Sequence, residues 1–288
     1  MFQNIKKIIL LGGTGQLGSD VERFLRNQKN MDVVCLPRSG LDLANPDQIG
    51  KKLGEINFDF LINCAAYNNV EESEVSRNEA FAINAEATGQ LARVSFLKKA
   101  FFIHISTDYV FDGKKGNSYT ESDLPCPIQV YGASKYEGEK QALKYNPHTY
   151  VLRVASLFGS AVSRKKGGSF AEKILALARD KKQISVVNDL VMSPTYTWDV
   201  ACMIGALIHK IPDRGVYHAV NSGQATWYEF AREIVSLKKL KTEVTPVPSS
   251  FFPSKVKRPV VSVLNNKKIS ELNGPVPDWR EGLRRCFL

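Results

Sequence analysis

Short apolar runs alternate with longer amphipathic segments along the first half of the chain. The apolar runs have the length of strands, and the segments between them repeat their apolar positions with the period of a helix. The expected strands are residues 7–11, 33–36, 60–63, 101–106 and 149–154, and the expected helices are residues 16–26, 46–56, 79–99 and 133–145. A strand–helix–strand order of this kind predicts an α/β fold with a doubly wound parallel sheet and right-handed crossovers.

The regular alternation of expected strands and helices ends near Gly159. Shorter strands are expected at residues 184–187 and 216–220, helices at residues 170–179, 197–209 and 227–237, and proline-rich loops between residues 246 and 259. The pattern predicts a smaller C-terminal α/β lobe that is partly woven back into the first domain. We expect the first domain at residues 1–159, with the chain returning to it near residues 184–221, and the second lobe at residues 160–183 and 222–288.

The composition is that of a globular protein. Of the 288 residues, 43% are hydrophobic and 24% are charged, and the chain is long enough to bury a core. The longest clean apolar run, residues 8–11, is far shorter than the roughly 18 residues that a membrane span needs. The five cysteines form no CxxC pair and the four histidines form no close pair, which favours free thiols and no metal site. We therefore expect a cytoplasmic protein that does not bind a membrane.

The net charge of +10 raises the question of an anionic partner. The basic residues occur as doublets along the whole length, for example at residues 6–7, 98–99 and 284–285. A protein that binds nucleic acid more often gathers such residues on one element. We expect solvated helix ends and loops and no nucleic-acid partner, although a basic field would also attract a phosphate-bearing small molecule.

A glycine-rich turn follows the first expected strand and opens the first expected helix. It consists of Gly12, Gly13, Thr14, Gly15, Gln16, Leu17 and Gly18. Glycines here permit a tight turn and a close backbone approach, so that amide N–H groups and the helix N-terminus can hold a pyrophosphate. Ordinary strand-to-helix turns also contain glycines, but the position at the start of a βαβ unit favours a Rossmann-type domain that binds a dinucleotide.

The end of the second expected strand bears on the choice of cofactor. An acidic residue there reads a ribose 2′-hydroxyl, whereas an arginine accommodates a 2′-phosphate. This chain has Arg38 at that place, which favours NADPH and leaves NADH possible. Asp42 and Leu43 follow closely enough to approach the adenine end of the cofactor. The alternative for Arg38 is a solvated surface charge, and for Asp42 a carboxylate at a helix start.

A tyrosine and a lysine stand four residues apart at the start of a later expected helix. Tyr131 and Lys135 therefore lie on one face of that helix. The phenol has an ordinary pKa of roughly 10 and donates a proton poorly until a neighbouring cation lowers that value, which Lys135 is placed to do. Thr107 follows an earlier strand and offers a hydroxyl for a substrate carbonyl. The pair alone is common by chance, so its significance depends on this context.

Together these segments resemble the dTDP-4-dehydrorhamnose reductase family, within the extended short-chain dehydrogenases/reductases. The glycine turn, residues 63–67, residues 106–111 and the Tyr131–Lys135 pair occur in the order and at the spacing of that family. Later segments at residues 187–189, 193–195, 215–218, 226–231 and 258–259 also match, so the resemblance covers nearly the whole chain. It implies the reduction of a 4-keto sugar nucleotide by NADPH or NADH, with dTDP-4-dehydrorhamnose as the expected substrate and dTDP-L-rhamnose as the product.

The resemblance also implies roles for individual residues. Thr107 would polarise the ketone, Tyr131 would donate the proton, and Lys135 would tune Tyr131 and bind the ribose. Ala65, Ala66 and Tyr67 would line the cofactor cleft, and Asp108, Tyr109, Ser156 and Arg258 would contact the substrate.

The sequence departs from the family pattern in three respects. Ser156 stands where the family often has a tryptophan against the sugar, and Leu190 stands where a glutamine commonly follows the aspartate. The acidic residues that help to form a metal-bridged dimer in some members cannot be placed in the tail at residues 284–288. We therefore expect a monomer or homodimer without a metal, and a sugar pocket that differs from that of relatives with the tryptophan.

Two other functions remain open at this stage. A nucleotide-sugar dehydratase or epimerase would share the fold, but dehydratases place an Asp-Glu pair after the threonine, where this chain has Asp108 and Tyr109. The family also includes the regulatory beta subunit of methionine adenosyltransferase, which keeps a cofactor-binding fold while serving another protein. An intact set of Thr107, Tyr131 and Lys135 is compatible with either an enzyme or such a subunit.

Overall fold

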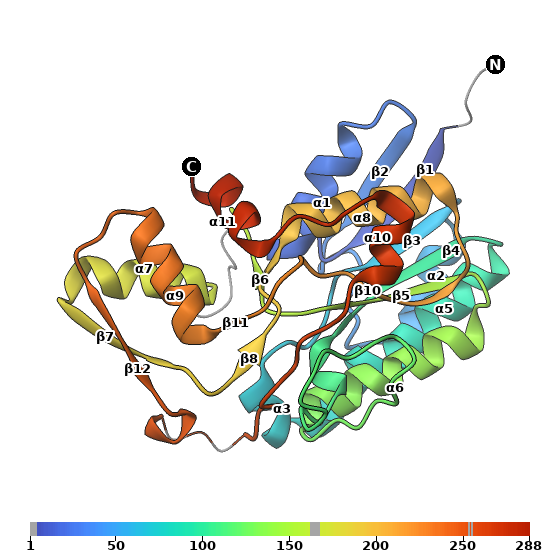
Figure 1. The fold of residues 1–288 in the computed structure, drawn as a ribbon. Coiled ribbons are helices and arrows are strands. Elements are labelled where there is room, and N and C mark those ends of the chain that lie inside the picture. The colour runs from blue at the N-terminus through green and yellow to red at the C-terminus, as the bar shows by residue number, and fades with distance from the viewer. Residues whose placement is uncertain (1–4, 162–167, 253, 255) are drawn as a thin grey trace.

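A parallel sheet of six strands forms the centre of the protein (Figure 1). The computed structural model describes residues 5–161, 168–252, 254 and 256–288. Across the sheet the strands follow the order β10-β5-β4-β3-β1-β2. Their bounds are β1 Lys6–Leu11, β2 Met31–Leu36, β3 Phe60–Asn63, β4 Phe101–Thr107, β5 Thr149–Val154 and β10 Gly215–His218. The doubly wound parallel sheet predicted from the sequence is confirmed, and its order reverses at β1, which pairs with β2 on one side and β3 on the other.

Helices cover both faces of this sheet. One face carries α1 (Gln16–Arg26) and α8 (Thr197–Lys210), and the other carries α2 (Asp47–Gly54), α5 (Ala87–Leu97) and α6 (Val130–Tyr145). Along β1, Ile8 and Leu10 belong to the core under α1 and α8, whereas Ile9 and Leu11 belong to the opposite core. This alternation explains the continuous apolar run at β1, because a strand covered on both faces needs apolar residues at every position.

The helix expected at residues 79–99 is divided into three parts. α4 (Arg77–Phe81) leads into a π-helical turn, η1 (Ala82–Glu86), which leads into α5, and a short helix, α3 (Val70–Val75), precedes them. A π-helical turn changes the direction in which its side chains point, and such turns are frequent at functional sites. Here the turn contains the buried Asn84, whose side chain contacts the loop that follows β3.

The second lobe has its own core, built on a small parallel sheet. β7 (Gln183–Val187) pairs with β12 (Glu243–Val247), and α7 (Phe170–Asp180), α9 (Trp227–Leu237) and α11 (Trp279–Phe287) pack around them. Trp279 and Phe230 are buried there, with their rings at an edge-to-face distance of 5.6 Å. Capping boxes begin α7 and α9, and each satisfies two backbone groups at a helix start.

Two short strand pairs contribute buried residues to the core of the second lobe. β6 (Leu157–Phe158) pairs with β9 (Thr195–Tyr196), and β8 (Val191–Met192) pairs with β11 (Ala225–Thr226). The 3-10 turns are η2 (Asp108–Val110) and η3 (Ser249–Phe251), and α10 is Lys267–Asn273.

The chain crosses between the lobes at positions that differ from those expected. The segment from residue 184, expected to return to the first domain, forms β7 and pairs with β12 instead. The return takes place at α8, which packs against α1, and at β10, which pairs with β5. α10, expected in the second lobe, contacts α8 and β10 (Figure 1). An alternating apolar run predicts a strand, but its pairing partner depends on distant residues.

The described residues include neither a membrane-spanning helix nor a metal-binding cluster. No helix among them combines the length and the apolar character that a membrane crossing requires. Within the same residues, His, Cys, Asp and Glu side chains form no group of three that could hold a metal ion.

Candidate active site

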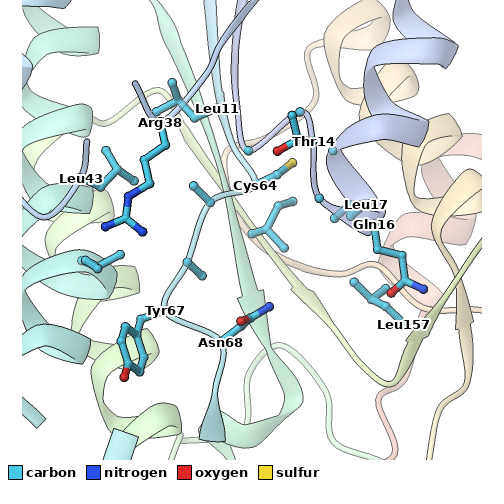
Figure 2. A pocket seen from close by; sticks show the side chains of 18 of the residues that line it. Leu11, Thr14, Gln16, Leu17, Arg38, Leu43, Cys64, Tyr67, Asn68 and Leu157 are labelled. Atoms are coloured by element: carbon cyan, nitrogen blue, oxygen red, sulfur yellow. The ribbon is translucent and has the colours of Figure 1, made fainter. Parts of the chain in front are cut away.

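A cavity of about 810 Å³ opens along the carboxyl ends of the central strands. In an open α/β sheet, ligands bind in this crevice near the point where the strand order reverses. The cavity is lined by residues 11–18, 35–38, 41–43, 64–68, 105–108 and 154–157 with gaps, together with Glu22, Glu79, Ile83, Tyr131 and Lys135. Figure 2 shows Thr14, Gln16, Arg38, Leu43, Cys64 and Tyr67 around this space.

The glycine turn between β1 and α1 forms one wall. Gly12 has a φ of +75°, and a Cβ built on it would lie 2.7 Å from the Ala65 nitrogen. A Cβ on Gly18 would lie 2.1 Å from the Gly12 carbonyl oxygen, so both positions need glycine. These contacts pack the start of α1 against β1 and leave the turn close to the loop after β3.

The N-terminus of α1 is suited to an anion. Its N-cap residue, Gly15, supplies no side chain to the first backbone N–H groups of the helix. Gln16 lines the cavity, and its buried Nε2 has no partner among the described residues. Free backbone donors, a helix N-terminus and an unpaired amide fit the pyrophosphate of a dinucleotide. The glycine-turn residues predicted to bind the cofactor therefore all lie on the cavity wall.

Arg38 lies at the far end of the same cavity. Its guanidinium Nε lies 3.2 Å from Asp42 Oδ2, and its side chain is 67% exposed. Asp42 also accepts a hydrogen bond from the Ala44 N–H, which lowers the pKa of its carboxyl group, and the Arg38 hydrogen bond acts in the same direction. Figure 2 shows Arg38 beside Leu43, where an adenosine would lie if the pyrophosphate lay on α1. Arg38, Asp42 and Leu43 thus share one end of the cavity.

The loop after β3 forms the opposite wall. The Ala65 N–H donates to Asn63 Oδ1 at 3.1 Å. The Tyr67 N–H donates to Asn84 Oδ1 at 2.9 Å, and Asn84 Nδ2 donates back to the Tyr67 carbonyl oxygen at 3.0 Å. Ala65, Ala66 and Tyr67 line the cavity, and two buried asparagines hold their backbone in place.

Thr107, Tyr131 and Lys135 come together at the centre of the cavity. Thr107 ends β4, Tyr131 lies in the first turn of α6, and Lys135 lies one turn further along that helix. Thr107 Oγ1 donates to Asp108 Oδ1 at 3.1 Å and accepts from the Tyr109 N–H. The parallel pairing of β4 with β5 and the packing of α6 on β4 bring these distant residues to one place.

The electrostatics of Tyr131 differ from the expectation. Burial raises the pKa of the phenol above its ordinary value, and a hydrogen bond with Thr107 opposes that shift. The expected lowering by Lys135 is wrong for this structure, because the lysine amine is turned toward β4. The phenol therefore remains protonated at neutral pH, as a proton donor must be.

Lys135 is almost fully buried and bonded to β4. Its Nζ donates to the Ile105 carbonyl oxygen at 2.6 Å and lies 3.2 Å from His104 Nε2. Burial lowers the pKa of Lys135 to about 8, while the charges of Glu139 and Cys64 act in the opposite direction. The side chain lines the cavity, so it can also reach a bound molecule there.

Comparison with known proteins assigns this arrangement to a family. The family model for the RmlD substrate binding domain matches residues 6–288. The chain belongs to this family. It is 32% identical over 290 residues to dTDP-4-dehydrorhamnose reductase of Aggregatibacter actinomycetemcomitans, covering 96% of this chain and 97% of the relative. It is 34% identical to spore coat polysaccharide biosynthesis protein SpsK of Bacillus subtilis, covering 96% and 95%.

A solved structure agrees with this assignment. The crystal structure of dTDP-4-dehydrorhamnose reductase from Bacillus anthracis in complex with NADP superposes with a TM-score of 0.91 at 36% identity, covering 98% of each chain. The family resemblance found in the sequence is thereby confirmed, as is the Rossmann-type α/β fold.

The predicted substrate residues of this RmlD-family protein lie at different distances from the cavity. Asp108 and Ser156 line it. Tyr109 lies outside the lining, with its ring edge-to-face on Tyr131 at 6.1 Å. Arg258 is also outside the lining and lies 3.3 Å from the Glu71 carboxylate. The structure therefore brings two of the four to the cavity wall, and a third, Tyr109, contacts Tyr131 of that wall.

Ser156 and Asp108 have unusual local environments. Ser156 has a φ of +41°, a left-handed conformation that residues other than glycine seldom adopt and that is often found at binding sites. Burial raises the pKa of Asp108 to about 6, against the opposing hydrogen bonds of Ser262 and Thr107. Asp108 therefore changes charge close to neutral pH.

Sequence reasoning missed two buried residues of this RmlD-family site. Asn84 holds Tyr67 and also donates to Ser134 Oγ at 3.0 Å. His104 lies on β4 beside Lys135. Both are polar residues within apolar runs, which is a signal for a site, but that signal does not identify the partner across the sheet.

Proposed function

We propose that this protein is an NADPH-dependent reductase that converts dTDP-4-dehydrorhamnose to dTDP-L-rhamnose. The observation that carries the proposal is the meeting of Thr107, Tyr131 and Lys135 with the glycine turn on one cavity. The names of the relatives in Aggregatibacter actinomycetemcomitans and Bacillus anthracis support the substrate, and the NADP complex of the latter supports the cofactor.

The proposed chemistry needs a hydride at C4 of the sugar and a proton on the ketone oxygen. The cofactor, when bound, supplies the hydride. Tyr131 supplies the proton from a phenol that stays protonated at neutral pH. Thr107 donates its hydroxyl hydrogen to Asp108 in the structure, so it would turn that donor toward the ketone when substrate enters. Lys135 would hold the nicotinamide ribose and restore the proton of Tyr131.

The choice of NADPH rests on the end of β2. No carboxylate stands there to bind a ribose 2′-hydroxyl, and the Arg38 guanidinium is exposed beside the cavity. A 2′-phosphate would compete with Asp42 for this guanidinium and would form a charge-assisted pair with it.

The sugar would lie between Thr107, Tyr131 and Ser156. The small hydroxyl of Ser156 leaves room where an indole would otherwise cover the ring, so the nucleotide diphosphate should contribute a larger share of the binding energy. Arg258 is proposed to contact that diphosphate after releasing Glu71. A cytoplasmic location and a monomeric or homodimeric state belong to the same proposal.

The direct test measures NADPH absorbance while the purified protein is offered dTDP-4-dehydrorhamnose, with the UDP- and GDP-linked 4-keto-6-deoxy sugars as comparisons. Turnover with the dTDP sugar and formation of dTDP-L-rhamnose, identified by NMR, are expected. Failure to oxidise NADPH with any of these sugars would contradict the proposal. Copurification with a larger enzyme subunit would then favour a regulatory role.

A further inference from the structure

Asn63, His104 and Lys135 form a buried chain that runs from one wall of the cavity to the lysine amine. Asn63 on β3 and His104 on β4 are register partners in the parallel sheet. Asn63 Nδ2 lies 3.4 Å from His104 Nδ1, and His104 Nε2 lies 3.2 Å from Lys135 Nζ. All three side chains are at most 2% exposed, so water cannot exchange freely with these atoms.

The backbone fixes the direction of the first hydrogen bond in this chain. The Ala65 N–H needs an acceptor, and it finds Asn63 Oδ1 at 3.1 Å. Asn63 must therefore present its Nδ2 donor to His104 Nδ1. A nitrogen that accepts a hydrogen bond carries no proton, so the proton of the neutral imidazole lies on Nε2.

The His104 imidazole does not take up a second proton. Burial and the nearby charge of Lys135 lower the pKa of His104 well below its ordinary value, so the ring is neutral. Its Nε2–H points at Lys135 Nζ, which can accept this hydrogen bond only as the amine, because an ammonium has no lone pair. The Ile105 carbonyl still accepts one N–H of that amine.

We propose that His104 is a positioning residue that donates its Nε2–H to the Lys135 amine and thereby helps the lysine ammonium to release its proton. The amine then keeps one N–H on Ile105 and directs the other into the cavity. This inference rests on the proposed function only where Lys135 is given a part in the reaction. The hydrogen-bond chain of Asn63, His104 and Lys135 does not depend on that function.

The groups that surround Lys135 are consistent with a lysine that exchanges protons near neutrality. From α6, Glu139 favours the ammonium, but it is held by Arg153 on β5 at 2.7 Å and also accepts from Ser106. From the loop after β3, Cys64 acts in the same direction as Glu139. Burial opposes both and dominates, which gives a pKa of about 8. A lysine of this kind can both return a proton to Tyr131 and take one up at working pH.

The test is the titration of Lys135 in the full-length protein, followed by the NMR signal of its labelled ε-carbon. Lys135→Met identifies the signal by its loss. We expect a midpoint below the ordinary lysine value in the native protein, and a midpoint about one pKa unit higher in His104→Gln. Asn63 cannot fix the orientation of a glutamine, whose Oε1 can turn to accept from the ammonium.

Two further variants complete the experiment. Asn63→Asp replaces the Nδ2 donor by an oxygen, places the imidazole proton on Nδ1 and should also raise the midpoint, so it serves if His104→Gln does not fold. Phe102→Leu is the packing control, because the Phe102 ring stacks on His104 at 5.9 Å without a polar contact. Its midpoint should equal that of the native protein even though its stability falls.

A native midpoint at the ordinary lysine value would overturn the proposal, and so would an unchanged or lower midpoint in the folded His104→Gln or Asn63→Asp variants. Because this readout needs no turnover, loss of activity with every keto sugar would count against the proposed function alone.

Discussion

The Asn84 side chain bonds to both backbone polar groups of Tyr67, accepting from its N–H at 2.9 Å and donating to its carbonyl oxygen at 3.0 Å. The Asn84 amide therefore pairs with the Tyr67 backbone as a neighbouring strand would, and it joins the π-helical turn to the loop that lines the cavity. The position of this cavity wall therefore depends on Asn84, which does not itself line the cavity.

Asn84→Ala should weaken both the fold and cofactor binding. The loss leaves both backbone polar groups of Tyr67 without their Asn84 partner, at a cost of about 2 kcal/mol in the free energy of unfolding. NADPH affinity, measured by fluorescence titration, should fall at least several-fold because the loop shifts. The control is Ser95→Ala, which removes a buried hydroxyl bonded only within α5. Equal NADPH affinity in the Asn84 variant and the native protein would show that the loop holds its place unaided.

Arg38→Ala should reduce the preference for NADPH over NADH. A charge-assisted hydrogen bond to the 2′-phosphate is worth about 1.5–3 kcal/mol, which predicts a loss of roughly ten-fold or more in kcat/KM for NADPH and little change for NADH. Arg284→Ala is the matched control, since Arg284 is similarly exposed and pairs with Glu281 three residues away on α11. If both variants keep the native ratio of the two cofactors, Arg38 is only a solvated charge.

Asp108→Asn should change how stability depends on pH. The folded-state pKa of Asp108 is raised to about 6, above an unfolded value of about 4, so the unfolded chain binds fewer protons between these values. This carboxyl group therefore makes the native protein less stable as pH rises from about 4 to about 6, by about 3 kcal/mol in total. Urea unfolding across this range should show that the variant gains stability relative to the native protein as pH rises. A constant difference between the two proteins would mean that Asp108 titrates normally.

Ser156→Trp should narrow the sugar range. An indole at this position would cover the sugar ring and lower KM for a 6-deoxyhexose, while turnover of bulkier or more polar 4-keto sugars declines. Ser156→Gly is the control for the backbone, because glycine tolerates the left-handed φ and adds no side chain. Steady-state kinetics with a panel of sugars compares the two. An unaltered range in the tryptophan variant would mean that Ser156 does not face the sugar.

The sequence predicted the features that depend on neighbouring residues. The glycine turn, the central strands and the spacing of Tyr131 and Lys135 follow from local periodicity and turn chemistry, and the structure places the glycine turn, Tyr131 and Lys135 on one cavity. What the sequence did not predict depends on distant partners. The pairing of β7 with β12, the bonds of Asn84 to Tyr67 and the contact of His104 with Lys135 join residues that lie 17 to 60 positions apart. The same non-local burial explains why the pKa of Tyr131 rises although a lysine stands one helical turn away.

The most direct measurement of the central claim compares Tyr131→Phe with the native protein in the reduction of dTDP-4-dehydrorhamnose by NADPH. The variant removes the proton donor and leaves the glycine turn and Lys135 intact, so kcat should fall by about 10² to 10⁴ while the Kd for NADPH changes by no more than a few-fold. A variant that turns over at nearly the native rate, with the same cofactor affinity, would contradict the account.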